Sequence, residues 1–356
     1  MKLPITGPKL IIIISFVLIS IYMSIIIIMN IYSKEEPFVD VLLAHEVIDM
    51  SGNDIQDNLI EETETKDLFT NPNEDIMFDM KTATLQIPKS IMSEVISQTD
   101  IDSELTYIFT YKGNPKPWSR TGLLTVISSI ELNDNCEIII KAADLLAFEI
   151  TEDDDNIYIH AVTPRDKYNR IVMLDPGHGG KDYGAVYESV FEKDLNLSIA
   201  QKAYELFSSG DSGIKAYMTR YGDEAVHVTE RPGISNSIAD MFISIHCNSF
   251  KSSAAYGTST YFNPDGTADT GRHNISNLDL ASILQDSLAS ALETRDLGLF
   301  QSTNIIVLNG ALVPAALIEV AYITNDADRN KLLTREFQQD AAQAIYEGII
   351  EAFEYK

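Results

Sequence analysis

From Ile171 to Phe353, short apolar runs alternate with segments in which apolar residues recur every three to four positions. The short runs predict strands, and the longer period predicts helices with one buried face. The predicted strands are Ile171–Leu174, Ala216–Thr219, Phe242–Ile245, Gly257–Phe262 at an edge, Ile305–Leu308 and Ala315–Glu319. The predicted helices are Leu195–Ser208, one that begins near Ser276, and one that carries Phe337 to Phe353. This alternation indicates an α/β fold over 170–356, with helices flanking a mixed, mainly parallel sheet.

The preceding segment, from about Thr82 to Val162, contains only strand-like runs separated by turn signals such as Gly113-Asn114-Pro115. Such spacing predicts a small β-rich module, which we assign to residues 81–165. Its predicted strands are Thr106–Tyr111, Leu123–Ile127, Cys136–Lys141, Ala147–Ile150 and Ile157–Ala161.

The N-terminus contains an uncharged run of 20 residues, Leu10–Met29, which is long enough to cross a bilayer as a helix. Lys2 and Lys9 precede it, so the short N-terminus is expected inside and the bulk of the chain outside the membrane. A cleaved signal peptide is the alternative, but the run is long and Asn30–Ser33 make a poor cleavage site. Residues 1–32 are therefore predicted to be a cytoplasmic tip and a transmembrane anchor.

Between the anchor and the β-rich module, Lys34–Asp79 holds fourteen acidic residues and two lysines, which predicts an acidic linker over 33–80. The whole chain of 356 residues carries a formal charge of −27. Such a balance excludes nucleic acid as a partner, because phosphate binding needs clusters of Lys and Arg.

Only two cysteines are present, Cys136 and Cys247, so the chain is not a disulfide scaffold. Cys247 adjoins His246 in an apolar run, where it is either a small buried side chain or a thiol ligand. Neighbouring side chains on a strand point to opposite faces. If His246 faces a metal, Cys247 is not expected to face it.

Four residues on separate segments are candidates for chemistry. His178 and His246 follow predicted strands, where ligands of such sheets bind, and Glu192 begins the first predicted helix. Two histidines and one carboxylate are the ligands of a catalytic zinc with an open fourth position. Each residue also has a purely structural interpretation: His178 as a histidine in a turn, His246 as a core histidine, and Glu192 as a carboxylate favoured at a helix start. Three neighbouring carboxylates compete with Glu192 as the oxygen ligand: Asp182, Glu188 and Asp194.

The fourth candidate, Glu319, lies in the apolar run LVPAALIEVAYI. An ionised carboxylate there is costly unless it is compensated, so a structural salt bridge is one interpretation. The other is a general base whose pKa is raised by burial. Together, the four residues suggest metal-assisted hydrolysis.

The chain resembles the zinc-dependent N-acetylmuramoyl-L-alanine amidases that carry a DxGHGGxDxGA motif, which stands here as Asp175–Ala185. The resemblance covers Arg170 to Phe353 in the family's order. Its further segments are Glu192–Leu197, Met218–Arg220 with Asp223, Arg231 with Ala239-Asp240, Ser244–Asn248, Gly257–Phe262 and Pro314–Asn325. The departures are Ala321, where the family often has Gly, and Cys247, where it often has Ala; both residues are small.

The resemblance implies a peptidoglycan hydrolase in which His178, Glu192 and His246 bind Zn²⁺ and Glu319 is catalytic. Zinc would polarise the lactyl carbonyl of N-acetylmuramic acid and activate water. Glu319 would pass the water's proton to the amine of L-alanine. Asn248 is a candidate for positioning the site.

Two other functions stay open: a zinc-dependent wall peptidase or carboxypeptidase, and an inactive wall-binding regulatory protein. The intact four-residue set disfavours the second. Regulated members of the family carry a long helical insertion that blocks the zinc site. Here the segment between Asn248 and Ser276 is too short for such an insertion, so a built-in block of the site is not expected. Ile130–Val162 loosely resembles the targeting domains of some family members, so wall binding and a spacer role are both open for the β-rich module. The expected partners are peptidoglycan and, through the N-terminal helix, the membrane; the oligomeric state is not predicted.

Overall fold

The computed structural model describes residues 75–123, 126–266 and 274–355, all within one compact unit, Leu68–Lys356. The predicted membrane anchor and most of the predicted acidic linker lie outside the described residues. Within the described ranges, no helix combines the length and apolarity needed to cross a membrane.

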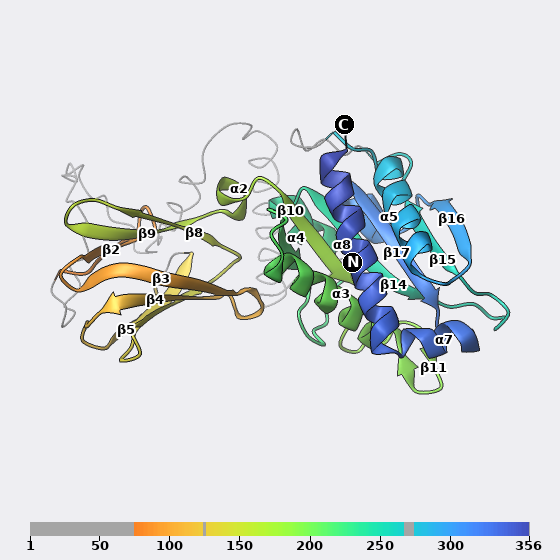
Figure 1. Ribbon diagram of the computed structural model, residues 1–356, viewed down its shortest axis with the longest axis horizontal. Coiled ribbons are helices and arrows are strands. Elements are labelled where there is room, and N and C mark those ends of the chain that lie inside the picture. The colour runs from red at the N-terminus through yellow and green to blue at the C-terminus, as the bar shows by residue number, and fades with distance from the viewer. Residues whose placement is uncertain (1–74, 124–125, 267–273, 356) are drawn as a thin grey trace, which may run out of the picture. The chain divides into compact units, whose positions relative to one another are not determined.

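The N-terminal part is built from two antiparallel sheets (Figure 1). The four-stranded sheet has the order β1 (Met77–Asp79), β2 (Thr84–Pro88), β9 (Asn156–Val162) and β8 (Ala147–Glu152). The five-stranded sheet has the order β3 (Met92–Ile101), β4 (Thr106–Gly113), β7 (Glu137–Ala142), β6 (Ile127–Leu132) and β5 (Trp118–Thr121). Side chains of both sheets share one apolar core, which includes Leu85, Phe109, Ile138 and Ile159.

Two sequence expectations for this part are corrected. The linker was predicted to reach residue 80, but Met77–Asp79 form β1 and pair with β2, because Ile76 and Phe78 are buried in the core. The strand predicted at Leu123–Ile127 has different bounds: β6 begins at Ile127, Leu123 is not part of it, and residues 124–125 lie outside the described residues.

The C-terminal part contains a six-stranded mixed sheet, so the predicted α/β class is confirmed. Its order is β13 (Lys215–Met218), β10 (Ile171–Pro176), β14 (Met241–Asn248), β17 (Ala315–Tyr322), β15 (Thr258–Phe262) and β16 (Asp296–Gln301). The first four strands are parallel, β15 is antiparallel to β17, and β16 is parallel to β15. The segment 257–262, predicted as an edge strand, lies one strand inside the edge, which is formed by β16.

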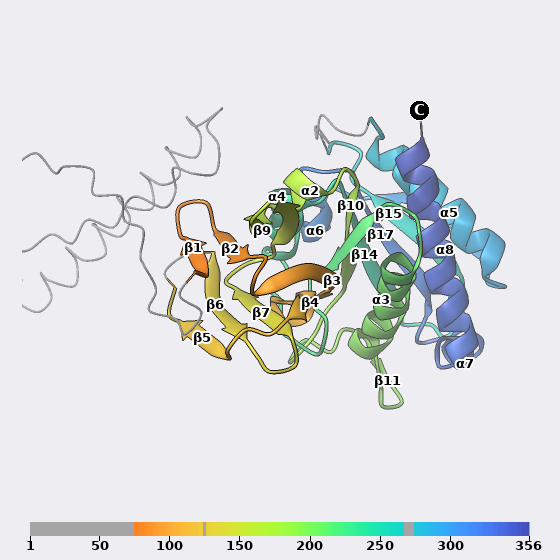
Figure 2. The same cartoon turned by 60° about the vertical axis from the view of Figure 1, so that its left-hand side comes forward.

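Helices cover both faces of this sheet (Figure 2). The long helices α3 (Glu192–Ser209), α5 (Asn277–Ala291) and α8 (Arg335–Glu354) pack on one face, and the short helices α4 (Arg231–Ile238) and α6 (Ile306–Gly310) pack on the other. The remaining elements are the 3₁₀ turn η2 (Asp102–Glu104), α2 (Pro164–Lys167), α7 (Asp326–Leu332) and the hairpin of β11 (Val186–Tyr187) and β12 (Val190–Phe191). The strand predicted at Ile305–Leu308 is wrong: the run forms α6, because Val307, Leu308 and Ala311 bury one helical side.

The alternation along β14 decides which side chains face which helices. Ile243, Ile245 and Cys247 belong to the core under α3, α5 and α8, whereas Phe242 belongs to the core under α4 and α6. Because strand side chains alternate, His246 lies on the α4 face. The prediction that Cys247 points away from His246 follows the same alternation.

Candidate active site

The base of the site is Asp175, a fully buried carboxylate near the end of β10. Its donors are Thr219 Oγ1 at 2.6 Å, Ser244 Oγ at 2.7 Å and Arg231 Nη1 at 2.7 Å. Thr219 follows β13, Ser244 lies on β14 and Arg231 begins α4. These contacts compensate the buried charge and tie the end of β10 to three neighbouring segments.

Two arginines hold the loop after Asp175 by its backbone carbonyls. Arg220 donates to the carbonyl oxygens of Pro176 and Gly177, each at 2.9 Å, and Arg231 Nη2 donates to that of His178 at 2.6 Å. His178 itself adopts a left-handed φ of 63°, which is uncommon for a residue other than glycine. The surrounding hydrogen bonds keep this conformation and direct the imidazole toward β14.

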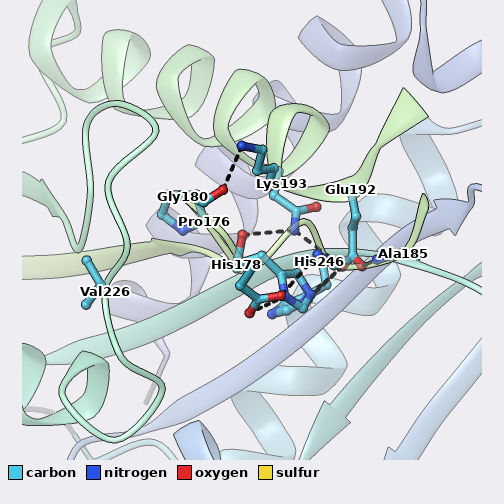
Figure 3. Close-up of polar contacts among 12 residues, drawn as sticks. Pro176, His178, Gly180, Ala185, Glu192, Lys193, Val226 and His246 are labelled. Carbon is cyan, nitrogen blue, oxygen red and sulfur yellow. Dashed lines mark hydrogen bonds and ion pairs between the residues drawn. The ribbon is translucent and has the colours of Figure 1, made fainter. Parts of the chain in front are cut away.

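Near the carboxyl ends of β10 and β14, the side chains of His178, Glu192 and His246 point toward one another (Figure 3). Glu192 Oε1 lies 3.2 Å from His178 Nε2 and 2.9 Å from His246 Nδ1. One ligand atom from each residue lies within 4.8 Å of the others, and this is the only such set in the part of the chain that the structure describes. The three residues form a donor set of the type that would hold a catalytic zinc.

A second layer of contacts orients these ligands. His178 Nδ1 lies 2.9 Å from Asp182 Oδ2, which leaves Nε2 for a metal. Glu192 Oε2 accepts a hydrogen bond from the Ala185 amide at 2.7 Å, which leaves Oε1 between the histidines. Gly184, with a φ of 64°, is packed so tightly that an added Cβ would lie 2.6 Å from both Glu192 Oε2 and His178 Cδ2.

The electrostatics of the cluster favour an ionised carboxylate and a charged imidazole when no metal is bound. Burial alone would raise the pKa of Glu192, but hydrogen bonds and charge from His178 and His246 outweigh it and hold that pKa far below its usual range. Burial would lower the pKa of His178, but Glu192 and Asp182 outweigh it and raise that pKa. The cluster is thus prepared to bind a cation in place of a proton.

The structure distinguishes Glu192 from the three neighbouring carboxylates that the sequence also offers as the oxygen ligand. Glu188 pairs with Arg329 at 2.9 Å, and 67% of its side chain is exposed. Asp182 contacts the outer nitrogen of His178, and Asp194 is exposed on the surface of α3. Only Glu192 among the four belongs to the converging set.

Glu319 lies one strand away from His246, directly opposite it in the register of β14 and β17. Register partners share a face, so both side chains lie on the α4 side of the sheet. Glu319 Oε2 is buried without a hydrogen-bond partner among the described residues. Burial raises the pKa of this carboxyl well above its usual range, and the charge of Glu192 adds to the shift. No salt bridge of Glu319 occurs in the described part of the chain, which disfavours the structural interpretation of this residue.

Around Glu319, the structure adds residues that the sequence patterns did not single out. Burial, followed by the charge of Glu319, raises the pKa of both Tyr261 and Tyr322, which places the two phenols near this carboxylate. Asn248 opposes this rise in the pKa of Tyr261, which places its side chain near that phenol. Tyr322 lies in an apolar run and Tyr261 in a strand with several polar residues, and only the strand register distinguishes them from core aromatics.

The comparison with protein families finds a match over residues 172–351 to Amidase_3, described as N-acetylmuramoyl-L-alanine amidase. An uncharacterized Bacillus subtilis protein, YqiI, is 39% identical over 181 residues, which are 51% of this chain and 83% of that protein. The amidase LytC of B. subtilis is 34% identical over 180 residues, covering 50% of this chain and 34% of LytC.

Among solved structures, an N-acetylmuramoyl-L-alanine amidase from Clostridium difficile 630 is 30% identical, with a TM-score of 0.49, and the match covers 52% of this chain and 98% of that one. The family match spans half of the chain and contains all four candidate residues. The chain therefore belongs to the Amidase_3 family and is an enzyme of the N-acetylmuramoyl-L-alanine amidase type.

Proposed function

We propose that this protein hydrolyses the amide bond between the lactyl group of N-acetylmuramic acid and the L-alanine of the stem peptide, with Zn²⁺ as cofactor. The observation that carries the proposal is the convergence of His178, Glu192 and His246, with Glu319 on the same face one strand away. Family membership supports peptidoglycan as the substrate.

The residues fit zinc on two structural grounds. His178 Nε2 and His246 Nδ1 both lie within 3.2 Å of one oxygen of Glu192, an arrangement in which a cation would replace the shared protons. Glu192 is buried and Glu319 is half-buried with a buried Oε2, so two carboxylates lie near each other with little solvent, which a divalent cation would compensate.

Zinc, when bound, supplies Lewis acidity that polarises the scissile carbonyl and makes water a better nucleophile near neutral pH. Glu319 accepts the proton of the attacking water and then donates it to the departing amine of L-alanine. A carboxyl whose pKa is raised by burial suits this exchange, because it both accepts and returns the proton at a moderate pH. His178, Glu192 and His246 hold the cation, and Asp182 fixes the tautomer of His178.

The proposed place of action is the outer side of the cell membrane, with the chain anchored through Leu10–Met29. The length of this uncharged run and the lysines before it support the proposal. For the β-rich N-terminal part, wall binding and a spacer role remain two proposals, which pull-down of that part with purified cell walls would distinguish.

Mass spectrometry of muropeptides, digested by the purified ectodomain with and without zinc, tests the proposal. We expect stem peptides with a free L-alanine amine. Products that keep the lactyl amide and are cut within the stem would instead support the wall peptidase. Glu319→Ala should abolish turnover while zinc stays bound, and retained activity would remove the general-base role.

A further inference from the structure

Three side chains form one row across the α4 face of the sheet. In β14 and β17, His246 is paired with Glu319, and in β17 and β15, Glu319 is paired with Ser259. Paired residues point to the same face of a sheet. The neighbouring pair of Tyr261 with Leu317, which packs under α4 and α6, confirms that this face is the α4 side. Ser259 is therefore the outer neighbour of Glu319, opposite to the proposed metal ligand His246.

Ser259 and Glu319 each have an unsatisfied polar atom on this row. Ser259 is fully buried, and its Oγ has no hydrogen-bond partner among the described residues. Glu319 Oε2 is also buried and has no partner there. A buried polar atom without a partner is costly, so two such atoms on adjacent strands call for an explanation.

The two groups are chemically complementary. An ionised carboxylate only accepts hydrogen bonds, whereas a serine hydroxyl rotates about its side-chain torsion and has one proton to donate. Directly opposed residues of an antiparallel pair have Cβ atoms about 4.5–5.5 Å apart, within reach of a glutamate and a rotating hydroxyl. The tyrosines near Glu319 are less suited to this role, because Tyr261 and Tyr322 are partly exposed and Tyr261 already contacts Asn248.

We propose that Ser259 is a positioning residue that donates a hydrogen bond from Oγ to Oε2 of the ionised Glu319. The bond would fix the carboxylate and leave Oε1 directed toward the attacking water. It would also stabilise the charged, proton-accepting form in a buried position where few other donors are present. This inference rests on the proposed role of Glu319 as general base.

Ser259→Ala is the direct test, because it removes the hydroxyl and almost no volume. A hydrogen bond to a charged group predicts a decrease in kcat of about 10- to 100-fold. KM, zinc content and thermal stability should stay near those of the unchanged protein, since Ser259 contacts neither substrate nor metal in this proposal. Ser259→Thr, which keeps the hydroxyl, should restore much of the lost kcat.

Ser235→Ala is the matched control. Ser235 lies on α4, is fully buried, and its Oγ likewise has no hydrogen-bond partner among the described residues. It is not in the row with Glu319, so its replacement should leave kcat unchanged. Equal losses in both variants would indicate a general effect of removing buried hydroxyls and would overturn the proposal.

A crystal structure of the zinc-loaded protein gives a measurement that does not depend on activity. We expect Ser259 Oγ within hydrogen-bond distance of Glu319 Oε2; a hydroxyl bonded elsewhere overturns the inference. Unchanged kcat in Ser259→Ala, with Glu319→Gln inactive, would reject the role of Ser259 alone. An active Glu319→Gln would reject the general base itself, so the two failures can be distinguished.

Discussion

At the scale of single residues, one carboxylate oxygen serves two imidazoles: Glu192 Oε1 contacts both His178 and His246. This arrangement makes proton and metal compete for the same atoms. Without metal, the raised pKa of His178 stabilises the fold fully below about pH 6.5, and this contribution is lost as the pH rises through the raised value. The lowered pKa of Glu192 stabilises the fold above about pH 4.3, and that contribution is lost as the pH falls.

The zinc-free protein therefore gains most from this cluster between about pH 4.3 and 6.5, whereas zinc binding requires a deprotonated His178. We predict that the increase in Tm caused by zinc grows from pH 5.5 to pH 8. Thermal unfolding at matched zinc concentrations measures it. A zinc-induced shift that is constant over this range would contradict the competition.

The choice of oxygen ligand gives a second prediction at this scale. Glu192→Ala should lower the zinc content of the purified protein strongly, because it removes a ligand and the contact that links the two histidines. Glu188→Ala is the control, since Glu188 is largely exposed and pairs with Arg329. Metal analysis by mass spectrometry measures both variants, and a larger loss in Glu188→Ala would reassign the ligand.

At the scale of elements, the loop after β10 leaves no room for a side chain at Gly177. An added Cβ at Gly177 would lie 2.2 Å from both Cε1 and Nε2 of His246. Gly177→Ala should therefore displace the His246 ring and lower zinc affinity at least tenfold, while most of the fold is retained. Gly233→Ala in α4 is the control, because no atom lies within 4 Å of its added Cβ. Equal zinc affinity in both variants, measured by competition with a chelator, would contradict this account.

The elements also show where sequence patterns suffice and where they fail. The apolar stripe of Leu195–Ser208 predicted α3. Of its members Leu195, Ile199, Ala203, Leu206 and Phe207, all are buried except Leu206, which is half-buried. The helix start near Ser276 was also predicted correctly: Ser276 precedes α5, and its side chain accepts a hydrogen bond from the Asp279 amide. The error at Ile305–Leu308 arose because a four-residue apolar run fits either a strand or a helix, and only packing against α4 decides between them.

For the site, strand ends were sufficient to bring His178 and His246 together, because carboxyl ends of parallel strands meet at one edge of a sheet. Glu192 could not be separated from Asp182, Glu188 and Asp194 by spacing, since all four lie in one loop and helix start. Glu188, for example, is excluded by its ion pair with Arg329, which is far away in the sequence. Ser259 was not predicted because its significance depends on the register of β15 against β17.

At the scale of the whole molecule, the turn between β3 and β4 places a buried carboxylate, that of Asp102, in contact with the α/β part. The Asp102 side chain has no exposed surface, and its Oδ2 accepts hydrogen bonds from Tyr204 on α3 and Lys215 on β13, both at 3.0 Å. Burial raises the pKa of Asp102, and Lys215 opposes this shift. The pair thus links the antiparallel sheets to the sheet that holds the site.

We predict that Lys215→Met destabilises the protein by roughly 2–3 kcal/mol, because it leaves the Asp102 carboxylate buried with one neutral donor. It should also separate the unfolding of the two parts into two transitions in urea. Lys112→Met is the control: its partner Glu94 is 58% exposed, so the loss should stay below about 1 kcal/mol. A single transition of unchanged midpoint in Lys215→Met would show that the link does not couple the two parts.

The three proposed metal ligands come from three segments that meet only when β10 and β14 pair, since β10 precedes His178 and β14 carries His246. An unfolded chain has no local fragment with the complete donor set, so zinc has little to bind before the sheet assembles. The metal should therefore leave the folding rate nearly unchanged and slow unfolding instead. At a free zinc concentration a hundredfold above Kd, the native state gains about 2.7 kcal/mol. If the protein acts on the outer side of the membrane, as proposed, that gain would determine how long each molecule remains active there.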